Sequence, residues 1–225
     1  MTQPSLHPWT FDPYEAIQLQ ENLRKLLVLA WDGRVVNTIG GVEINTVRDM
    51  LRVTITVLTY PEMSPLIHAS MDMPVEFPYI PGLLAFRVGP AILATWEKLT
   101  LKPDLLMLQG HGTAHPHGIG LASHMGLWLN LPSLGVAKTC LYGSHSKAGS
   151  QVGDWSEVLD EIDTKSVIGA VLCTRVNTKP IYVSPGHLID LHHSIRFVLA
   201  CCRGDRLPEP IRAARKNVTT ASLPS

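Results

Sequence analysis

The chain shows two spacings of hydrophobic and polar positions, and each spacing predicts a different kind of element. Residues 51–60 alternate between apolar and polar side chains, which predicts a strand with one buried face. Residues 14–30 repeat apolar side chains near every third or fourth position, which predicts a helix. The same reasoning predicts further strands over residues 35–43, 66–73, 105–108, 133–137, 167–174 and 180–184, and further helices over residues 83–99, 118–130 and 188–202.

Three segments depart from this simple succession of helices and strands. Gly89-Pro90 is expected to interrupt the helix over residues 83–99, because proline supplies no backbone donor. Residues 144–165 are polar and are expected to form an excursion from the sheet. Residues 211–225 are basic at first and then poor in apolar side chains, so we expect them to be a flexible tail.

The order of these elements indicates an α/β fold. The first three strands follow one another directly, which predicts an antiparallel meander. The run at residues 105–108 is continuously apolar, as is typical of a central parallel strand buried on both faces. A meander followed by alternating strands and helices predicts a mixed sheet with helices on both faces. A chain of 225 residues fits one domain spanning residues 1–225.

The composition indicates a globular protein but gives no strong indication of a binding partner. Apolar residues make up 45% of the chain and charged residues 17%, which excludes a disordered chain. The formal net charge is zero and the pI is near 7.1. Nucleic-acid binders are usually basic overall, because neutralising phosphates provides much of their affinity. A local patch of Lys and Arg is nevertheless enough for binding.

Cysteine usage and the N-terminal sequence indicate a cytoplasmic protein. The cysteines, Cys140, Cys173, Cys201 and Cys202, include no C-x-x-C pair, so we expect reduced thiols. The N-terminus lacks the basic and apolar regions of a signal peptide, and no run of about 18 apolar residues predicts a membrane span.

The most specific motifs lie between Phe77 and Gly143. They read FPYIPGLLAFR from Phe77, KPDLLMLQGHGTAHPHGIGLASHMGL from Lys102, and LGVAK from Leu134. Together with SPGH and PEP nearer the C-terminus, these motifs resemble the endonuclease V family, nucleases that recognise deaminated bases. The resemblance covers nearly the whole chain and implies a ribonuclease H-like architecture.

The resemblance also implies a Mg²⁺-dependent cleavage site, but the matching positions differ from the family pattern. Mg²⁺ needs hard oxygen ligands, mainly carboxylates, to polarise a phosphate and activate water. At the family's carboxylate positions this chain has Glu43, Val88 and Gln109, and Arg215 matches a family histidine. Only Glu43 keeps an acid and remains a candidate metal ligand. We therefore expect cleavage to be lost or much weakened.

The residues that the resemblance assigns to recognition are better preserved. A stiff, proline-bracketed wedge of Tyr79, Ile80 and Pro81 would hold an extruded base out of the stack. His115 and Lys138 match residues near the scissile strand and could contact phosphate. The pocket for hypoxanthine would be lined by Gly82, Leu84, Gly110, Gly112, Gly120 and Leu121.

Three hypotheses on function remain open from the sequence. The first is a monomer that binds DNA or RNA containing deaminated bases (inosine), with cleavage lost or weakened. The second is a still-active Mg²⁺-dependent endonuclease that cuts near the lesion. The third is a partner-binding protein that keeps the fold without a nucleic-acid role. A separate alternative for the metal is Zn²⁺ held by His111, His115 and His117, although their spacing matches no specific zinc pattern.

Overall fold

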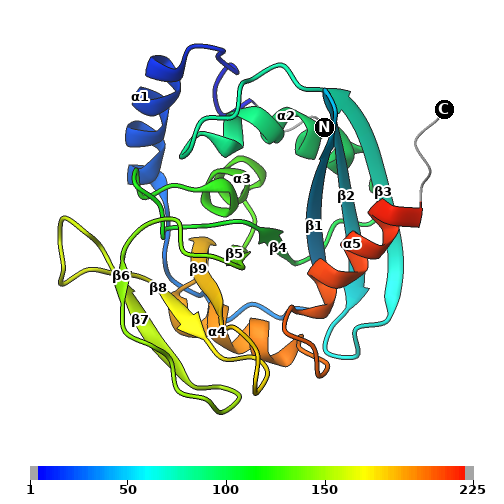
Figure 1. Cartoon of the computed structure of the whole chain (residues 1–225). Coiled ribbons are helices and arrows are strands. Elements are labelled where there is room, and N and C mark those ends of the chain that lie inside the picture. Colours follow the sequence, from blue (N-terminus) through cyan, green and yellow to red (C-terminus); the bar gives the residue numbers. More distant parts are fainter. Residues whose placement is uncertain (1–4, 221–225) are drawn as a thin grey trace.

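One mixed sheet of nine strands organises the molecule (Figure 1). The structure, a computed structural model, describes residues 5–220. The strands are β1 (Thr38–Val47), β2 (Met50–Thr59), β3 (Pro65–Pro74), β4 (Leu105–Gln109), β5 (Ser133–Ala137), β6 (Ser144–His145), β7 (Trp155–Leu159), β8 (Val167–Leu172) and β9 (Ile181–His187). Their order across the sheet is β3-β2-β1-β4-β5-β9-β8-β7-β6.

The sheet combines an antiparallel meander with parallel central strands. β1, β2 and β3 pair antiparallel in succession, as their direct succession along the sequence predicted. β4 lies parallel to β1 and β5 lies parallel to β4, so the apolar run at residues 105–108 is a central parallel strand. The predicted fold class is therefore confirmed.

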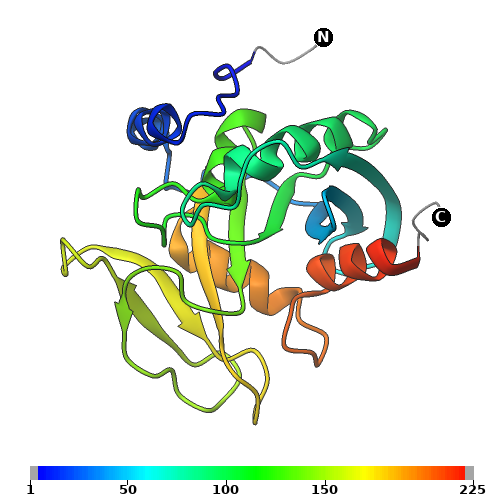
Figure 2. The same ribbon diagram turned by 45° about the horizontal axis from the view of Figure 1, so that its top comes forward.

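Helices cover both faces of the sheet (Figure 2). α2 (Leu84–Glu97) and α3 (Leu121–Leu129) pack in one apolar cluster with residues such as Leu106 and Leu108 of β4. α4 (Leu191–Ala200) and α5 (Glu209–Thr220) contribute to a second cluster with Leu105 and Met107. Because successive side chains of a strand point to opposite faces, the continuous apolar run of β4 supplies both clusters.

The first helix is shorter than the sequence pattern predicted. α1 spans Pro13–Leu23 and continues as a single 3-10 turn, Arg24–Leu26. The chain then becomes extended, and Val28 bonds to the end of β9 and the residue after it: its amide donates to the His187 side chain at Nδ1, and its carbonyl accepts from the backbone amide of Leu188. Pairing with a distant strand therefore overrides the local helical pattern.

The predicted interruption at Gly89-Pro90 is wrong. α2 runs through Pro90 without a break. Val88 and Ala91, on either side of the Gly89-Pro90 pair, are buried in the apolar cluster under α2, so packing offsets the missing hydrogen bond. Gly89 is also needed for packing, because a Cβ atom there would lie 2.3 Å from the ring of Trp9.

Residues 211–220 are also not the flexible tail that we expected. They belong to α5, which packs on β1 and β2, and Ile211 is fully buried. Asn217 donates to Thr56 of β2 at 3.0 Å. The close fit requires Gly41, where an added Cβ would lie 1.9 Å from the backbone carbonyl oxygen of Pro210. Residues 221–225 lie outside the described part.

The remaining differences concern strand ends. The first strand is shifted towards the C-terminus, because the Asp104 carboxylate accepts from the backbone of Asn37 and Thr38 and the hairpin with β2 continues past Glu43. Residues 144–165 include β6 and β7, which extend the sheet instead of leaving it. Within residues 5–220, no helix is long and apolar enough to span a membrane.

Candidate functional site

Glu43 and Gln109 lie side by side because of the register between two strands. β1 and β4 pair in parallel with Val42 opposite Leu108, so the next residue of each strand is also a neighbour. Since side chains alternate along a strand, both Glu43 and Gln109 share the sheet face of Met107, which α5 covers. The sheet therefore brings together the two positions that the sequence singled out.

The Gln109 side chain contacts the Glu43 carboxylate directly. With its amide nitrogen facing the acid, the orientation that the hydrogen-bond pattern favours, Gln109 donates at 2.5 Å to Oε2 and at 3.3 Å to Oε1. Glu43 is only 7% exposed, and burial raises the pKa of its carboxyl. The positive charges of Lys138 and Arg215 act in the opposite direction on this pKa, which places both cations near the acid.

Val88 is not beside an acid-rich site but in the apolar core. It is 1% exposed and belongs to the cluster that also contains Val42 and Leu108, the residues that precede Glu43 and Gln109. Within residues 5–220, no group of three or more His, Cys, Asp or Glu side chains is arranged to hold a metal ion.

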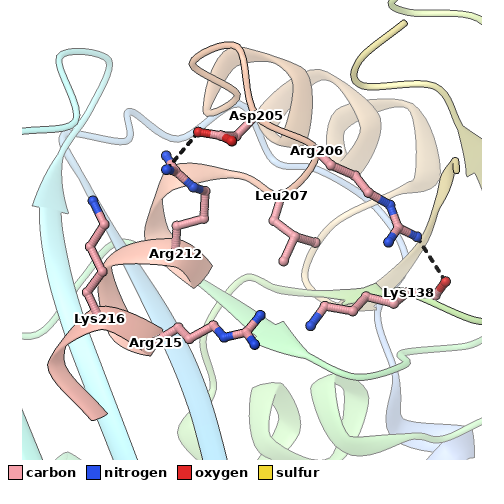
Figure 3. Close-up of a pocket in the computed structure, with 7 residues that line it drawn as sticks. All are labelled: Lys138, Asp205, Arg206, Leu207, Arg212, Arg215 and Lys216. Atoms are coloured by element: carbon pink, nitrogen blue, oxygen red, sulfur yellow. Dashed lines mark hydrogen bonds and ion pairs between the residues drawn. The ribbon is translucent and has the colours of Figure 1, made fainter. Parts of the chain in front are cut away.

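A basic cavity of about 460 Å³ lies between the end of β5 and α5 (Figure 3). The side chains of Lys138 and Arg215 point toward each other across it (Figure 3). Asp205 is the acid in the described lining and lies 2.7 Å from Arg212. The described lining consists of Lys138, Asp205, Arg206, Leu207, Arg212, Arg215 and Lys216.

A second, smaller cavity gathers most of the residues that the family resemblance assigns to base binding. Its volume is about 50 Å³. Leu141, an exposed residue in the segment after β5, forms part of its wall. The lining consists of Gln20, Gly82, Leu84, Ala85, Gly110, His111, His115, Gly120, Leu121 and Leu141.

The other predicted recognition residues lie outside this cavity. Gly112 packs against β9, where an added Cβ would lie 2.0 Å from the carbonyl oxygen of Pro185. Tyr79 and Pro81 are exposed on the segment before α2, and Ile80 packs against the cluster around Phe77. The wedge therefore projects from the surface next to Gly82, a residue of the cavity wall.

The loop between β4 and α3 contributes uncharged histidine rings to this second cavity, which we call the base cavity. Burial lowers the pKa of His115 to about 4, and its ring hydrogen-bonds to the backbone of Gly82. Burial also lowers the pKa of His111 to about 4. The backbone amide of His117 lies 3.2 Å from His115 Nδ1, so this nitrogen accepts a hydrogen bond. At pH 7 both cavity histidines are uncharged.

Sequence reasoning missed two parts of the site, although both left a signal. Gln20 occupies the buried stripe of α1 and its Nε2 donates to the carbonyls of Gly82 (2.8 Å) and Ile119 (3.3 Å), which joins two walls of the base cavity. A polar residue on an apolar helical stripe is such a signal. The second part is the cationic face of α5, where Arg212 and Lys216 are separated by one helical turn.

The comparison with known proteins is consistent across the whole chain. A family model described as Endonuclease V matches residues 21–216. An endonuclease V of Trichormus variabilis is 41% identical over 213 residues, 93% of this chain and 95% of the relative. An endonuclease V of Roseiflexus sp. is 37% identical over 224 residues and spans both chains completely.

Solved structures give the same result. Endonuclease V from Streptomyces avermitilis superposes with a TM-score of 0.88 at 34% identity, over 94% of this chain and 93% of that one. Endonuclease V from Ciona intestinalis, crystallised with DNA containing an inosine followed by a ribo-adenosine, superposes with a TM-score of 0.82 at 24% identity, over 92% and 95%.

The sheet order, the helices on both faces and these neighbours define an α/β protein of the ribonuclease H-like class. The match over residues 21–216 and the identities near 40% then specify the group within that class. The chain belongs to the endonuclease V family.

Proposed function

We propose that this protein binds inosine-containing nucleic acid through the base cavity and that the metal-dependent cleavage of its family is lost or much weakened. The loss or weakening of cleavage is supported by one observation, the contact between Glu43 and Gln109, which Lys138 and Arg215 flank. Family members are nucleases that generally depend on a metal ion, typically Mg²⁺.

The side chains at the proposed centre do not fit Mg²⁺. The ion requires near-octahedral oxygen ligands, and carboxylates must balance its charge. Here Glu43 is the one acid at the matched positions, and the Gln109 amide nitrogen faces it. Val88 is buried and apolar, and the guanidinium of Arg215 repels a cation. The donor set is therefore one carboxylate with two positive side chains nearby.

The recognition half rests on the cavity at the end of β4. Five of the six pocket residues suggested by the resemblance line one cavity, and the wedge of Tyr79 and Pro81 lies beside it. A flipped base would lie against the apolar walls Leu84 and Leu121, while backbone groups would offer hydrogen bonds. A family member crystallised with inosine-containing DNA supports the same class of ligand.

Four free cysteines favour a reducing compartment such as the cytoplasm.

The test combines cleavage and binding on the same oligonucleotides. Inosine-containing DNA and RNA are incubated with the protein in Mg²⁺ or Mn²⁺, and we expect no product above the level without protein. Binding measured by fluorescence anisotropy should be tighter for inosine than for guanosine at the same position. Efficient cutting would overturn the loss of cleavage, and equal affinities would overturn the base pocket.

The wedge provides a sharper test of recognition. Tyr79→Ala should weaken binding of the inosine oligonucleotide by about 1–3 kcal/mol, because a stacking ring is lost. The side chain is 71% exposed, so the folded state should be unaffected. Tyr14→Ala on α1 removes a similarly exposed ring (78%) outside the cavity and serves as the matched control. Identical affinities of the two variants would count against the wedge.

A further inference from the structure

A separate cavity, which we call the aromatic cavity, lies at the end of the sheet where β1 begins and β2 ends. Its volume is about 240 Å³, and Val36 before β1 and Tyr60 after β2 form part of its wall. The base cavity lies at the opposite end, where β4 ends, because β4 runs parallel to β1. About eight residues of extended chain, at about 3.3 Å each, separate the levels of Val36 and Gly110, so the two cavities are roughly 25 Å apart along the sheet.

Aromatic rings from three segments that are distant in the sequence line the aromatic cavity. Trp31 lies in the extended segment between α1 and β1, Tyr60 follows β2, and His193 and Phe197 are one turn apart on α4. The Trp31 ring stacks on His193 at 5.7 Å between centroids and meets Phe197 edge-on at 5.3 Å. Tyr60 lies 5.5 Å from Phe197. The rings of Trp31, Tyr60 and Phe197 pack against the core but are only partly buried, so part of each ring remains available to a ligand.

Arginine side chains surround these rings. Arg34 and Arg196 belong to the lining and are exposed. Burial and the nearby Cys201 raise the pKa of Tyr60, and the charges of Arg196 and Arg203 lower it, which places both guanidiniums near the phenol. Within residues 5–220, no acidic side chain belongs to the lining.

The acids that adjoin the aromatic cavity are already engaged by other side chains. Asp32 accepts from the Arg34 guanidinium at 2.5 Å, and Asp190 Oδ2 lies 2.7 Å from His193 Nδ1. These contacts balance the charge of Arg34 and orient the His193 ring. The charge that the lining presents to a ligand is therefore mainly that of Arg196.

This combination of side chains suits a ligand that is both aromatic and anionic. Aromatic rings bind flat rings by stacking, and a guanidinium can donate two parallel hydrogen bonds to the oxygens of a phosphate. A nucleotide carries both groups a short distance apart. The volume of about 240 Å³ lies below the range of about 300–1,000 Å³ that is typical of drug-sized ligands, so it suits one base with its phosphate at the exposed arginines.

We propose that the aromatic cavity is a second nucleotide-binding site, in which the base stacks on Trp31 and Phe197 and Arg196 holds the phosphate. The nucleotide is either a free mononucleotide or a unit of a nucleic-acid strand that continues beyond the base cavity, and both present the same chemistry. The site lies at the other end of the sheet from the base cavity and does not depend on the function proposed for it.

The experiment measures binding of adenosine monophosphate (AMP) by calorimetry, with adenosine and ribose phosphate as partial ligands. AMP is the probe because the base cavity is proposed for hypoxanthine instead. We expect AMP to bind and each partial ligand to bind at least about tenfold more weakly, since one lacks the phosphate and the other lacks the stacking base.

Two variants test the residues that carry the proposal. Arg196→Gln should weaken AMP binding about tenfold, and the exposed position of Arg196 should leave the folded state unaffected. Trp31→Leu should weaken it about tenfold or more, whereas Trp31→Phe keeps a ring and should retain most of the affinity. The urea unfolding midpoint of each variant shows whether the protein is still folded.

The controls change residues outside the aromatic cavity. Lys165 is exposed in the turn between β7 and β8, so Lys165→Gln removes a positive charge elsewhere and should leave AMP binding at the parent value. Tyr79→Ala changes the wedge beside the base cavity and should also leave AMP binding unchanged. The proposal is overturned if neither AMP nor oligonucleotide binding depends on Trp31 or Arg196.

Oligonucleotides separate the two sources of the nucleotide. Fluorescence anisotropy compares a long inosine oligonucleotide with one too short to reach both cavities. If Arg196→Gln weakens binding of the long oligonucleotide and not of the short one, the aromatic cavity holds a unit of the same strand. If only AMP binding changes, it holds a free nucleotide. The ratio of inosine to guanosine affinity reports the base cavity alone, so a ratio of one in the parent would remove base recognition and leave the second site intact.

Discussion

Glu43 is an acid whose surroundings favour its neutral form. Burial removes water from the carboxylate, and this effect on the pKa outweighs the opposing charges of Lys138 and Arg215. The hydrogen bonds from the Gln109 amide hold the side chain in place without supplying a full positive charge. A single buried acid thus remains where the family pattern has several carboxylates.

This balance predicts that Glu43→Gln stabilises the protein at neutral pH. The folded pKa lies above the value of the unfolded chain, near 4.5, so the folded state holds the proton more tightly and stability decreases as the pH rises through that window. The neutral amide removes the penalty at pH 7 and resembles the protonated acid near pH 4.5.

The measurement is the urea unfolding midpoint at the two pH values. The advantage of Glu43→Gln over the parent should be present at pH 7 and shrink towards pH 4.5. Glu157→Gln, at an exposed position of β7, should show no comparable advantage. A variant less stable than the parent at pH 7 would mean that the two cations stabilise the carboxylate more than burial opposes it.

At the residue scale, the sequence indicated candidate positions for the site but not the contacts between them. The motifs around Gly82 and Gly110 predicted one pocket, and the register of β1 and β4 brought Glu43 and Gln109 together. Gly112 lies outside that cavity, because its close approach is to Pro185 of β9, and a motif cannot distinguish such an approach from close approach to a ligand.

At the scale of elements, α5 shows where local pattern is insufficient. The segment is basic and has few apolar residues, and such a composition favours a solvent-exposed segment over one packed on the sheet. Two small contacts reverse the outcome: Ile211 is fully buried against the sheet, and Gly41 admits the backbone of Pro210. The sheet residues that contact α5, including Gly41, are far from α5 in the sequence. Periodicity therefore could not reveal that α5 packs on the sheet and brings Arg215 to the basic cavity.

The docking of α5 predicts a large effect of Ile211→Ala. Deleting a fully buried Ile side chain should lower the free energy of unfolding by about 2–5 kcal/mol. It should also weaken oligonucleotide binding in EDTA, because α5 carries cations of the basic cavity. Ile162→Ala makes the same change at a residue that is 90% exposed and should stay within about 0.5 kcal/mol of the parent. Equal stabilities of the two variants would show that α5 is not docked.

At the scale of the whole molecule, buried neutral histidines set the response to acid. His7 and His124 are 2.7 Å apart between their Nε2 atoms and pack among Trp9, Phe86 and Trp128. This cluster joins the N-terminal segment to α2 and α3. Burial lowers the pKa of His124 to about 3 and also lowers that of His7.

These histidines predict that the protein loses stability between about pH 6.5 and pH 4. In that window the unfolded chain binds protons at these histidines that the folded state does not bind, so the free energy of unfolding decreases as the pH falls. The paired carboxylate of Asp32, whose pKa is about 2, contributes only at lower pH. Urea unfolding at pH 7, 5.5 and 4.5 measures the slope, which His124→Phe should flatten even if it lowers stability at pH 7. His68→Phe, at an exposed position of β3, should keep the slope of the parent. A slope that is the same in His124→Phe and in the parent would contradict the neutral state of the buried pair.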